Sequence, residues 1–344
     1  MTSSTQIRLA ARPLGEPLDS DFEFVETELP ELADGQVLLR TVYLSLDPYM
    51  RGRMSAAKSY AKPVEVGDVM VGGTVCEVVE SRSPRRQVGD IVLAYSGWQT
   101  YAVADARHTR RLDPGAAPIS TALGVLGMPG FTAYAGLLAI GQPQPGDTVV
   151  VAAATGPVGS AVGQIAKVKG ARAVGIAGGS EKCRALVDEF GFDAAVDHRS
   201  PTFDDDLVAA TPDGVDVYFE NVAGPVGAAV VRRLNKFARV PVCGLVANYN
   251  ATEPPQGTDH LPGFLNAILT LSLTVRGFIQ DEFVPTHHDD FLREMAGWVA
   301  DGSVRYREDV VEGLEKTPEA FRGLLAGRNF GKLLVRVGDD PTTD

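Results

Sequence analysis

The sequence predicts an α/β fold in which a doubly wound parallel sheet is inserted into a barrel-like β domain. Three observations favour this fold. A buried strand, a glycine turn and a helix follow one another over residues 148–170. Strand-like and helix-like segments then alternate, and short strand-like segments occupy the first third of the chain and return at its end. Alternation favours a parallel sheet covered by helices, whereas consecutive short strands favour an antiparallel domain.

The glycine turn has the pattern of a dinucleotide-binding unit. Thr148–Ala154 is apolar and β-branched, as is typical of a strand buried on both faces, and apolar residues recur at helical spacing from Val158 onward. Between them, Gly156 allows the backbone to approach a pyrophosphate and Gly159 allows the helix to lie close to the strand. Ala154 replaces the first glycine of the usual pattern, so the turn alone is equally compatible with an ordinary strand-to-helix connection.

The segments after this turn supply the context for a nucleotide-binding domain over residues 127–307. Further strands are predicted at Ala171–Ala177, Ala194–Asp197, Val215–Phe219, Ala238–Val246 and Leu273–Phe278, and helices at Glu181–Phe190, near Pro225 and at Asp289–Asp301. This alternation of strands and helices predicts a parallel, doubly wound sheet.

Residues 1–126 and 308–344 are predicted to form the β-rich domain. Its segments are short and glycine-punctuated. Strands are predicted at Gln36–Leu44, Val69–Val79, Ile91–Ala94 and Lys332–Val337, with helices at Leu123–Gly141, which leads into the nucleotide-binding domain, and at Pro318–Gly323.

Composition and charge narrow the class of protein. The 344 residues are 44% apolar and 22% charged, which is typical of a globular protein. The net charge of −12, with no basic cluster, argues against nucleic acid and anionic membranes as partners. Cys76, Cys183 and Cys243 are too few and too far apart for a disulfide framework, and neither a signal peptide nor a membrane span is apparent, so we expect a cytoplasmic protein.

Six segments carry a resemblance to a known family. They are LSLDPYMRGRM (44–54), GMPGFTAY (127–134), AATGPVGSAVGQIAKVKG (153–170), DVYFENVAG (216–224), CGLVANYN (243–250) and GRNFGKLLV (327–335). In this order they resemble the zinc-independent prostaglandin reductase, leukotriene hydroxydehydrogenase and 2-alkenal reductase branch of the medium-chain dehydrogenase/reductases. The resemblance implies a Rossmann domain inserted into a GroES-like β domain.

The zinc site of other members of this superfamily is not expected here. Those relatives carry a Gly-His-Glu stretch and a cysteine cluster, whereas the corresponding region, Val71–Glu80, contains no histidine and a single cysteine. Because four-coordinate zinc requires several nitrogen or sulfur ligands that converge, we expect catalysis without a metal.

The end of the second predicted strand favours NADPH over NADH. An NAD site usually places Asp or Glu there to bind the ribose 2′-hydroxyl. Here Val174–Ser180, which includes Gly178, contains no acid, and Lys182 follows, which can meet a 2′-phosphate. The resemblance further places His198 where relatives use a tyrosine beside this phosphate. Arg199 could serve instead, or the two could form an ordinary surface loop.

The resemblance assigns the other residues of the cofactor site. Asn221 ends the fourth strand where the family packs the nicotinamide ribose, although an asparagine there could simply cap a turn. Asn329 would reach the cofactor from a glycine-rich turn, and Phe278 would pack on the nicotinamide unless it is only a core residue. The implied cofactor residues are Ala154, Thr155, Gly156, Pro157, Val158, Gly159, Gly178, Lys182, His198, Asn221, Cys243, Tyr249, Phe278, Ile279 and Asn329.

Tyr249 is the candidate catalytic residue. In the family, the tyrosine of a CG-x-x-x-x-YN motif and the nicotinamide ribose hydroxyl hold the enolate oxygen that forms when hydride adds to the β-carbon of an enone, and Tyr249 occupies that motif position. Its phenol donates a hydrogen bond at physiological pH, because its reference pKa is about 10. A half-buried loop aromatic is the competing interpretation. Tyr49 and Arg51 are expected in the substrate pocket, unless Arg51 holds its own loop through backbone carbonyls.

Together these residues predict NADPH-dependent reduction of the carbon–carbon double bond of α,β-unsaturated aldehydes and ketones. Quinone reduction with the same cofactor, and NADPH binding by a regulator without turnover, are the alternatives. The expected partners are a small enone or enal and, by analogy with relatives that pair through the edge strand near Leu273–Phe278, a second copy of the chain. The loop Asn250–Pro262 is expected to shape the substrate pocket.

Overall fold

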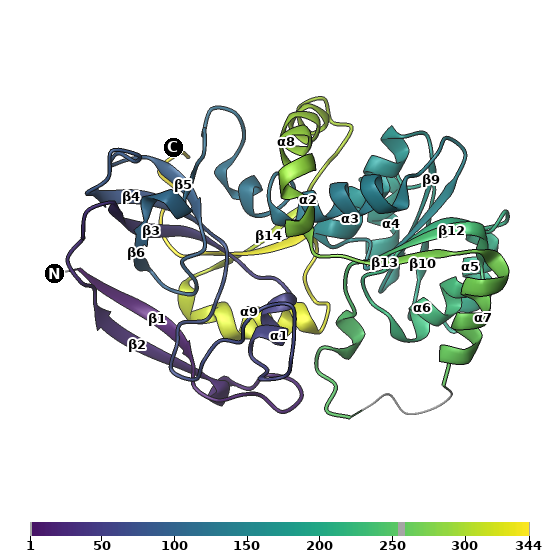
Figure 1. Cartoon of the computed structure of the whole chain (residues 1–344), viewed down its shortest axis with the longest axis horizontal. Helices are drawn as coiled ribbons and strands as arrows, with labels where there is room; N and C mark the ends of the chain where they lie inside the picture. The colour runs from purple at the N-terminus through teal and green to yellow at the C-terminus, as the bar shows by residue number, and fades with distance from the viewer. Residues whose placement is uncertain (1, 254–258, 344) are drawn as a thin grey trace. The chain divides into compact units, whose positions relative to one another are not determined.

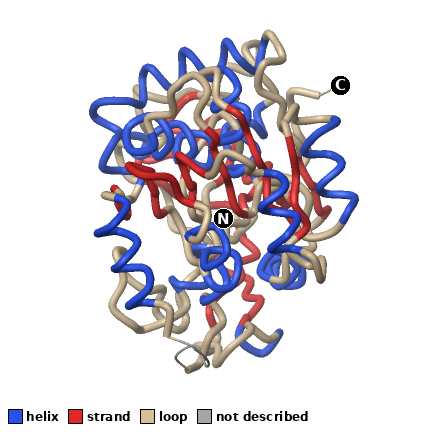
Figure 2. Tube along the Cα trace, turned by 90° about the vertical axis from the view of Figure 1, so that its right-hand side faces the viewer, coloured by secondary structure: helices blue, strands red, loops and turns tan. Residues whose placement is uncertain are grey.

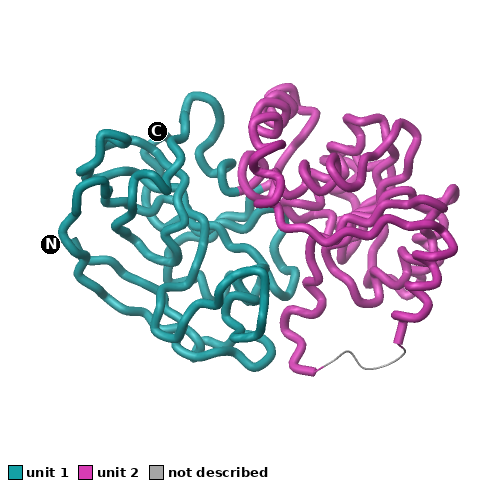
Figure 3. Tube along the Cα trace, in the orientation of Figure 1, with its two compact units in different colours: residues 1–123, 308–344 teal, residues 124–307 magenta. Residues whose placement is uncertain are grey.

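The computed structural model describes residues 2–253 and 259–343, which belong to two compact units. One unit comprises residues 1–123 and 308–344, and the other comprises residues 124–307 (Figure 3). The predicted loop Asn250–Pro262 includes residues 254–258, which lie outside the described residues. The chain leaves the first unit once and returns to it once, so the second unit is an insertion.

The second unit is built on a six-stranded parallel sheet. Its strands are β8 (Thr148–Ala152), β9 (Arg172–Ala177), β10 (Ala194–Asp197), β11 (Val215–Phe219), β12 (Leu234–Val242) and β13 (Thr274–Gly277). They lie in the order β10-β9-β8-β11-β12-β13, and each neighbouring pair is parallel. This is the doubly wound order of a Rossmann sheet, in which the direction of winding reverses between β8 and β11.

Helices cover both faces of this sheet (Figure 1 and Figure 2). Figure 1 shows α2 (Met128–Ala135) and α3 (Pro157–Val168) above the sheet, and α6 (Gly224–Val231) and α7 (Leu261–Leu271) below it. The remaining helices of this unit are α4 (Ser180–Asp188), α5 (Phe203–Ala210) and α8 (Val284–Ala300). All five residues of β8 are buried, as a strand covered on both faces requires. None of the helices among the described residues is long and apolar enough to cross a membrane.

The first unit is a mainly antiparallel β domain. Its larger sheet has the order β14-β15-β3-β4-β5-β7, with β6 also paired to β3, and β1 and β2 form a separate two-stranded sheet. The last strand, β15, pairs antiparallel with β3, so the returning end of the chain completes this sheet. The elements are β1 (Ser3–Leu9), β2 (Phe22–Glu28), β3 (Gln36–Ser45), α1 (Tyr49–Arg53), β4 (Thr74–Ser81), β5 (Ile91–Ala94), β6 (Tyr101–Asp105), β7 (Arg110–Arg111), β14 (Glu308–Glu312), α9 (Thr317–Leu325) and β15 (Lys332–Arg336).

Two strands of the second unit end earlier than predicted. The strand predicted at Thr148–Ala154 ends at Ala152, because Ala153 adopts a positive φ of 52° and turns the chain. The strand predicted at Ala238–Val246 is β12, which begins four residues earlier and contains an irregularity at Phe237, whose φ is 67°. It ends at Val242 because the next two N–H groups both donate to the Glu220 carbonyl, at 2.9 and 3.2 Å.

Two longer predictions also prove wrong in detail. The helix predicted over Leu123–Gly141 begins only at Met128, because Gly127 has an extended backbone, and its end over Gly136–Gly141 is a π-helical turn; Leu123 is the last residue of a separate 3-10 helix. The strand predicted over Val69–Val79 begins only at Thr74. The residues before Thr74 bond to other segments, and Met70 bridges β1 and Trp98 through its backbone. The sequence interpretation missed β1, β2, α1, β6, β7, α5, α7 and β14.

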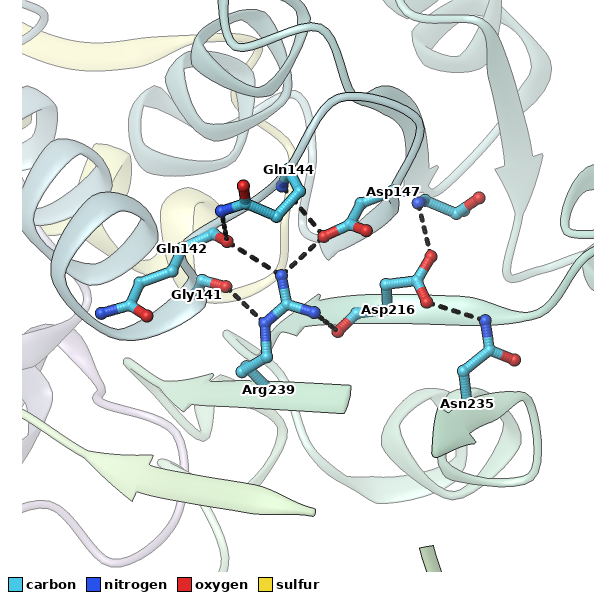
Figure 4. Close-up of polar contacts among 8 residues, drawn as sticks. Gly141, Gln142, Gln144, Asp147, Asp216, Asn235 and Arg239 are labelled. Carbon is cyan, nitrogen blue, oxygen red and sulfur yellow. Dashed lines mark hydrogen bonds and ion pairs between the residues drawn. The ribbon is translucent and has the colours of Figure 1, made fainter. Parts of the chain in front are cut away.

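A guanidinium group connects three segments at the amino end of the parallel sheet (Figure 4). Arg239 of β12 donates to the carbonyls of Gly141 at 2.8 Å, Gln142 at 2.9 Å and Asp216 at 3.2 Å. It also forms an ion pair of 2.6 Å with Asp147. The linker that precedes β8 is therefore tied to β11 and β12, which fixes where β8 enters the sheet.

Replacing Arg239 by methionine should lower the free energy of unfolding by about 3 kcal/mol, because a half-buried carboxylate and three carbonyls lose one donor group. Urea denaturation followed by circular dichroism measures the change. Arg232→Met is the control, since its ion pair with Asp204 joins side chains that are 57% and 68% exposed. That control should cost less than about 1 kcal/mol. Equal losses in the two variants would contradict the role assigned to Arg239.

Candidate functional site

The turn after β8 presents backbone N–H groups at the start of α3. Ala153 reverses the chain, and the Gly156 N–H closes the turn by donating to the Ala153 carbonyl at 3.0 Å. The Ser160 N–H donates to the Gly156 carbonyl at 2.9 Å, which is the first hydrogen bond of α3. The N–H groups of Val158 and Gly159 precede the first hydrogen bond of α3, so they have no acceptor within the helix. With the helix dipole they form a place suited to an anion.

Close packing at this turn explains why Ala154 can replace the usual glycine. A Cβ atom at Gly159 would lie 2.5 Å from the Ala153 carbonyl oxygen and 2.7 Å from the Ala154 Cα, so this position excludes a side chain. A Cβ atom at Gly175 of β9 would lie 2.9 Å from the Ala154 Cβ. The neighbouring strand therefore supplies the space that the methyl group of Ala154 occupies. Thr155 and Pro157 complete the turn and the first position of α3.

An aspartate that the sequence interpretation did not single out organises the ends of β9 and β10. The Asp197 carboxylate accepts hydrogen bonds from the N–H groups of Gly179 at 2.8 Å and Arg199 at 2.9 Å. The Gly179 bond is the largest cause of the lowered pKa of Asp197, and the Arg199 N–H adds to it. The carboxylate is thus bound by the backbone at the end of the third strand. Its strand-end position was the signal available in the sequence.

Three basic side chains gather at the ends of these two strands. A Cβ atom at Gly178 would lie 2.9 Å from Nε2 of His198 and 2.8 Å from Nε of Arg199. Burial lowers the pKa of His198, and the positive charges of Arg199 and, to a smaller extent, Lys182 lower it further, against the opposing effect of Asp197. Because the charges of Arg199 and Lys182 oppose protonation of His198, an anionic group bound among the three would be attracted by both charges and would favour protonation of the imidazole.

The turn after β11 is held by two polar side chains. Asn221 donates from its Nδ2 to the Ala152 carbonyl at 2.9 Å, which joins the ends of β8 and β11 at the point where the sheet reverses its winding. The buried Glu220 carboxylate, which sequence reasoning also missed, accepts from the N–H groups of Val222 at 2.6 Å and Ala223 at 2.8 Å. Asn221 therefore does bond to the backbone, as a turn-capping asparagine would, at the carboxyl edge where such sheets bind ligands.

Tyr249 lies beside the same strand ends. It follows a short 3-10 helix, Val246–Asn248, and is half-buried. A Cβ atom at Gly244 would lie 3.3 Å from the Tyr249 hydroxyl and 3.3 Å from the Asn221 carbonyl oxygen, so the hydroxyl lies close to the ends of β11 and β12. Burial, with the nearby charge of Glu220, raises the pKa of the Cys243 thiol to about 12. Cys243 is therefore a neutral thiol at physiological pH.

Phe278 and Ile279 follow β13 in different environments. The Phe278 ring is buried and meets Phe219 and Phe283 edge-on, with ring centroids 6.1 and 6.0 Å apart. A Cβ atom at Gly136 would lie 2.4 Å from this ring, so the π-helical turn packs directly against it. Core packing thus accounts for the burial of Phe278. Ile279 is half-buried, and its N–H donates to the Glu282 carboxylate at 2.9 Å.

The remaining predicted residues belong to the first unit. Arg51 is buried and donates to the Gly15 carbonyl at 3.2 and 2.8 Å and to the Pro13 carbonyl at 3.5 Å, so it does hold a loop through backbone carbonyls. Tyr49 begins α1, and burial together with the charge of Asp47 raises its pKa. Asn329 donates to the Gly331 carbonyl at 2.8 Å.

The structure therefore brings the predicted residues of the second unit to one edge of the parallel sheet, at the ends of β8 to β13. Tyr49, Arg51 and Asn329 lie apart from these in sequence and in unit. Among the described residues, no group of three or more His, Cys, Asp or Glu side chains is arranged to hold a metal ion.

Comparisons with known families agree with this architecture. A family model described as the N-terminal domain of oxidoreductase matches residues 5–112, and one described as zinc-binding dehydrogenase matches residues 157–294. The chain is 53% identical over 333 residues to an NADPH-dependent curcumin reductase from Escherichia coli K12, and the match covers 96% of each chain. It is 43% identical over 323 residues to prostaglandin reductase 1 from Oryctolagus cuniculus, covering 92% of this chain and 89% of the relative.

A solved structure shares the fold over nearly the whole length. The crystal structure of CurA in complex with NADPH from Vibrio vulnificus superposes with a TM-score of 0.94 at 50% identity, covering 98% of this chain and 100% of that one. A quinone oxidoreductase from Pseudomonas syringae shares the fold at 20% identity, with a TM-score of 0.73.

Proposed function

We propose, because the chain belongs to the prostaglandin reductase branch of the zinc-independent medium-chain dehydrogenase/reductases, that it is an NADPH-dependent reductase of the carbon–carbon double bond in α,β-unsaturated aldehydes and ketones. The observation that carries the proposal is the position of the Tyr249 hydroxyl near the ends of β11 and β12, at the edge of the sheet where β8 leads into the glycine turn. A hydrogen-bond donor at that edge is what an enone carbonyl requires.

The second unit has groups suited to each part of NADPH. The N–H groups at the start of α3 suit a pyrophosphate, and the absence of a side chain at Gly159 keeps the helix close to β8. Lys182, His198 and Arg199 suit the 2′-phosphate, since their mutual repulsion would be relieved by an anion. Asn221 and Cys243 would flank the nicotinamide ribose, and Asn329 would meet the cofactor from the first unit.

Tyr249 would stabilise the negative charge that forms on the substrate during the reaction. NADPH, when bound, supplies the hydride that the β-carbon of the substrate accepts. Negative charge then develops on the carbonyl oxygen of the substrate, and a phenol placed there would stabilise the enolate by donating a hydrogen bond. A proton from solvent would then add to the α-carbon and give the saturated carbonyl. Tyr49 of α1 would line the substrate side, with Arg51 holding the loop before β2 in place.

We also infer a homodimer and a cytoplasmic location. β13 is an edge strand of the parallel sheet, and α7 next to β12 exposes Leu261, Leu265 and Leu269 at four-residue spacing. Two copies can join such edges about a twofold axis. Three free cysteines fit a reducing compartment. Sedimentation of the chain as a monomer at all concentrations would refute the dimer.

The proposed reaction is tested with NADPH or NADH against a trans-2-alkenal, an enone and a quinone. We expect oxidation of NADPH in preference to NADH, and a saturated carbonyl product identified by its mass. Reduction of the quinone alone would favour the quinone oxidoreductase alternative. Tight NADPH binding without turnover on any acceptor would favour a regulator.

Replacing Tyr249 by phenylalanine should lower kcat for alkenal reduction about 100-fold or more, because the donor to the developing oxyanion is lost. The dissociation constant of NADPH, measured by fluorescence titration, should change little. Tyr43→Phe serves as the control, because it removes another tyrosine hydroxyl, bonded to Asp340 at 3.1 Å in the β domain. An unchanged kcat in Tyr249→Phe would end the catalytic assignment.

The pKa of His198 predicts a pH-dependent affinity for NADPH. In the free protein this pKa is lowered from its usual value of 6.5, so the imidazole is neutral at pH 7. A bound 2′-phosphate would raise the pKa, so binding takes up a proton and the affinity should rise as the pH falls from about 8 to about 6. NADH, which lacks this phosphate, should not show the rise.

The control for this effect is His198→Gln. The phosphate itself takes up a proton near pH 6, which would weaken binding at low pH, and the variant displays that effect alone. We expect the NADPH affinity of the parent to gain roughly threefold to tenfold over the variant between the two pH values. Parallel pH profiles would assign the phosphate to Arg199, in which case Arg199→Gln should weaken binding at every pH.

A further inference from the structure

A buried ion pair links the last strand of the chain to the start of α1. Lys332 of β15 is 2% exposed, and its Nζ donates to the Leu46 carbonyl at 2.7 Å and to the Asp47 carboxylate at 2.9 Å. The other carboxylate oxygen of Asp47 accepts from the Ser45 hydroxyl. All of these groups lie within the first unit.

A second carboxyl group faces the same lysine. Glu308 of β14 is the register partner of Lys332, so the two side chains project to the same side of the sheet. Burial raises the pKa of Glu308, whereas Ser120 and the charge of Lys332 lower it. Burial lowers the pKa of Lys332, and the charges of Asp47 and Glu308 raise it.

Stability alone does not account for this arrangement. Two buried charges must give up their hydration, and a pair of well-packed apolar side chains is often as stable or more stable. We therefore explain this buried ion pair by a requirement that the backbone beside it keep a single conformation. Here the lysine bonds to a main-chain carbonyl as well as to the carboxylate, so it fixes the path of the backbone at Leu46 and Asp47.

That backbone leads directly into α1. The Met50 N–H donates to the Asp47 carbonyl at 3.1 Å, and Tyr49 lies between them at the first position of the helix. On the other side, Arg51 is fixed by the carbonyl groups of Pro13 and Gly15. Lys332 therefore supplies the anchor on the N-terminal side of a five-residue helix that is too short to be stable by itself.

We propose that Lys332 is a positioning residue for the substrate side of the reaction: its ammonium group holds the Leu46–Asp47 backbone and thereby the orientation of Tyr49. The inference rests on the proposed function only in the role that it gives Tyr49. The segment that carries Lys332 also carries Asn329 three residues earlier, so the returning chain holds both a residue expected at the cofactor and the anchor of a residue expected at the substrate.

The test compares Lys332→Met, Lys332→Arg and Asp47→Asn with the parent. Amide hydrogen exchange of a peptide covering residues 46–54 measures the anchoring without any substrate, and we expect exchange at least about tenfold faster in Lys332→Met. Steady-state kinetics should show KM for an alkenal raised about tenfold, with the dissociation constant of NADPH unchanged. Lys332→Arg should recover part of both effects. The double variant Lys332→Met with Asp47→Asn should add little to Lys332→Met, because the two residues act as one unit.

Arg336→Met is the matched control on the same strand. Its ion pair with Glu312 joins side chains that are 44% and 58% exposed, so neither exchange nor KM should change. Unchanged exchange over residues 46–54 in Lys332→Met, or faster exchange throughout the first unit with KM unaltered, would overturn the proposal. If Lys332→Met does not fold, Asp47→Asn provides the same two readouts. A parent that reduces no enone refutes the proposed function, and the exchange measurement then still decides the anchoring.

Discussion

The second unit depends on the short distance between the start of α3 and the end of β8. The two elements approach so closely that Gly159 admits no side chain, and Gly175 in the neighbouring strand makes room for Ala154. This contact holds the start of α3 against the turn at the end of β8, beside which the strand order reverses. The other candidate groups of the second unit lie at the same edge, because the carboxyl ends of its six parallel strands meet there.

Basic side chains gather at the carboxyl edge of the parallel sheet, although the protein as a whole is acidic. The chain has a net charge of −12, yet Lys182, His198 and Arg199 collect beside the end of β9. Two acids close to the site are bound by the backbone: Asp197 accepts two N–H groups and Glu220 accepts two more. A carboxylate that is bound in this way rigidifies a turn and has less capacity to repel an anionic ligand. A locally basic site can therefore form in an acidic protein.

The sequence predicted those parts that depend on local pattern. The parallel sheet, β10, β11 and the glycine turn followed from buried apolar runs and turn residues, and the family resemblance identified the segments that carry the site. Prediction from the sequence failed where contacts between residues distant in the chain decide the structure. The first part of β12 lies before an irregularity at Phe237, and the π-helical turn after α2 packs Gly136 against Phe278, neither of which a local pattern reveals. Asp197 and Glu220 were missed because a strand-end acid has no pattern that reveals which backbone N–H groups it will meet.

The first unit is held together by contacts between residues that lie before and after the inserted unit in the chain. Lys332 and Asp47 are separated by 285 positions along the chain, and the antiparallel pairing of β15 with β3 brings them together. Ser120 and Glu308, which flank the insertion, lie near enough for Ser120 to lower the pKa of the Glu308 carboxyl. The chain therefore leaves and re-enters the first unit at neighbouring points, so the inserted residues add only a modest closure entropy. The N-terminal side of α1 is thus held by a strand that follows the whole inserted unit in the sequence.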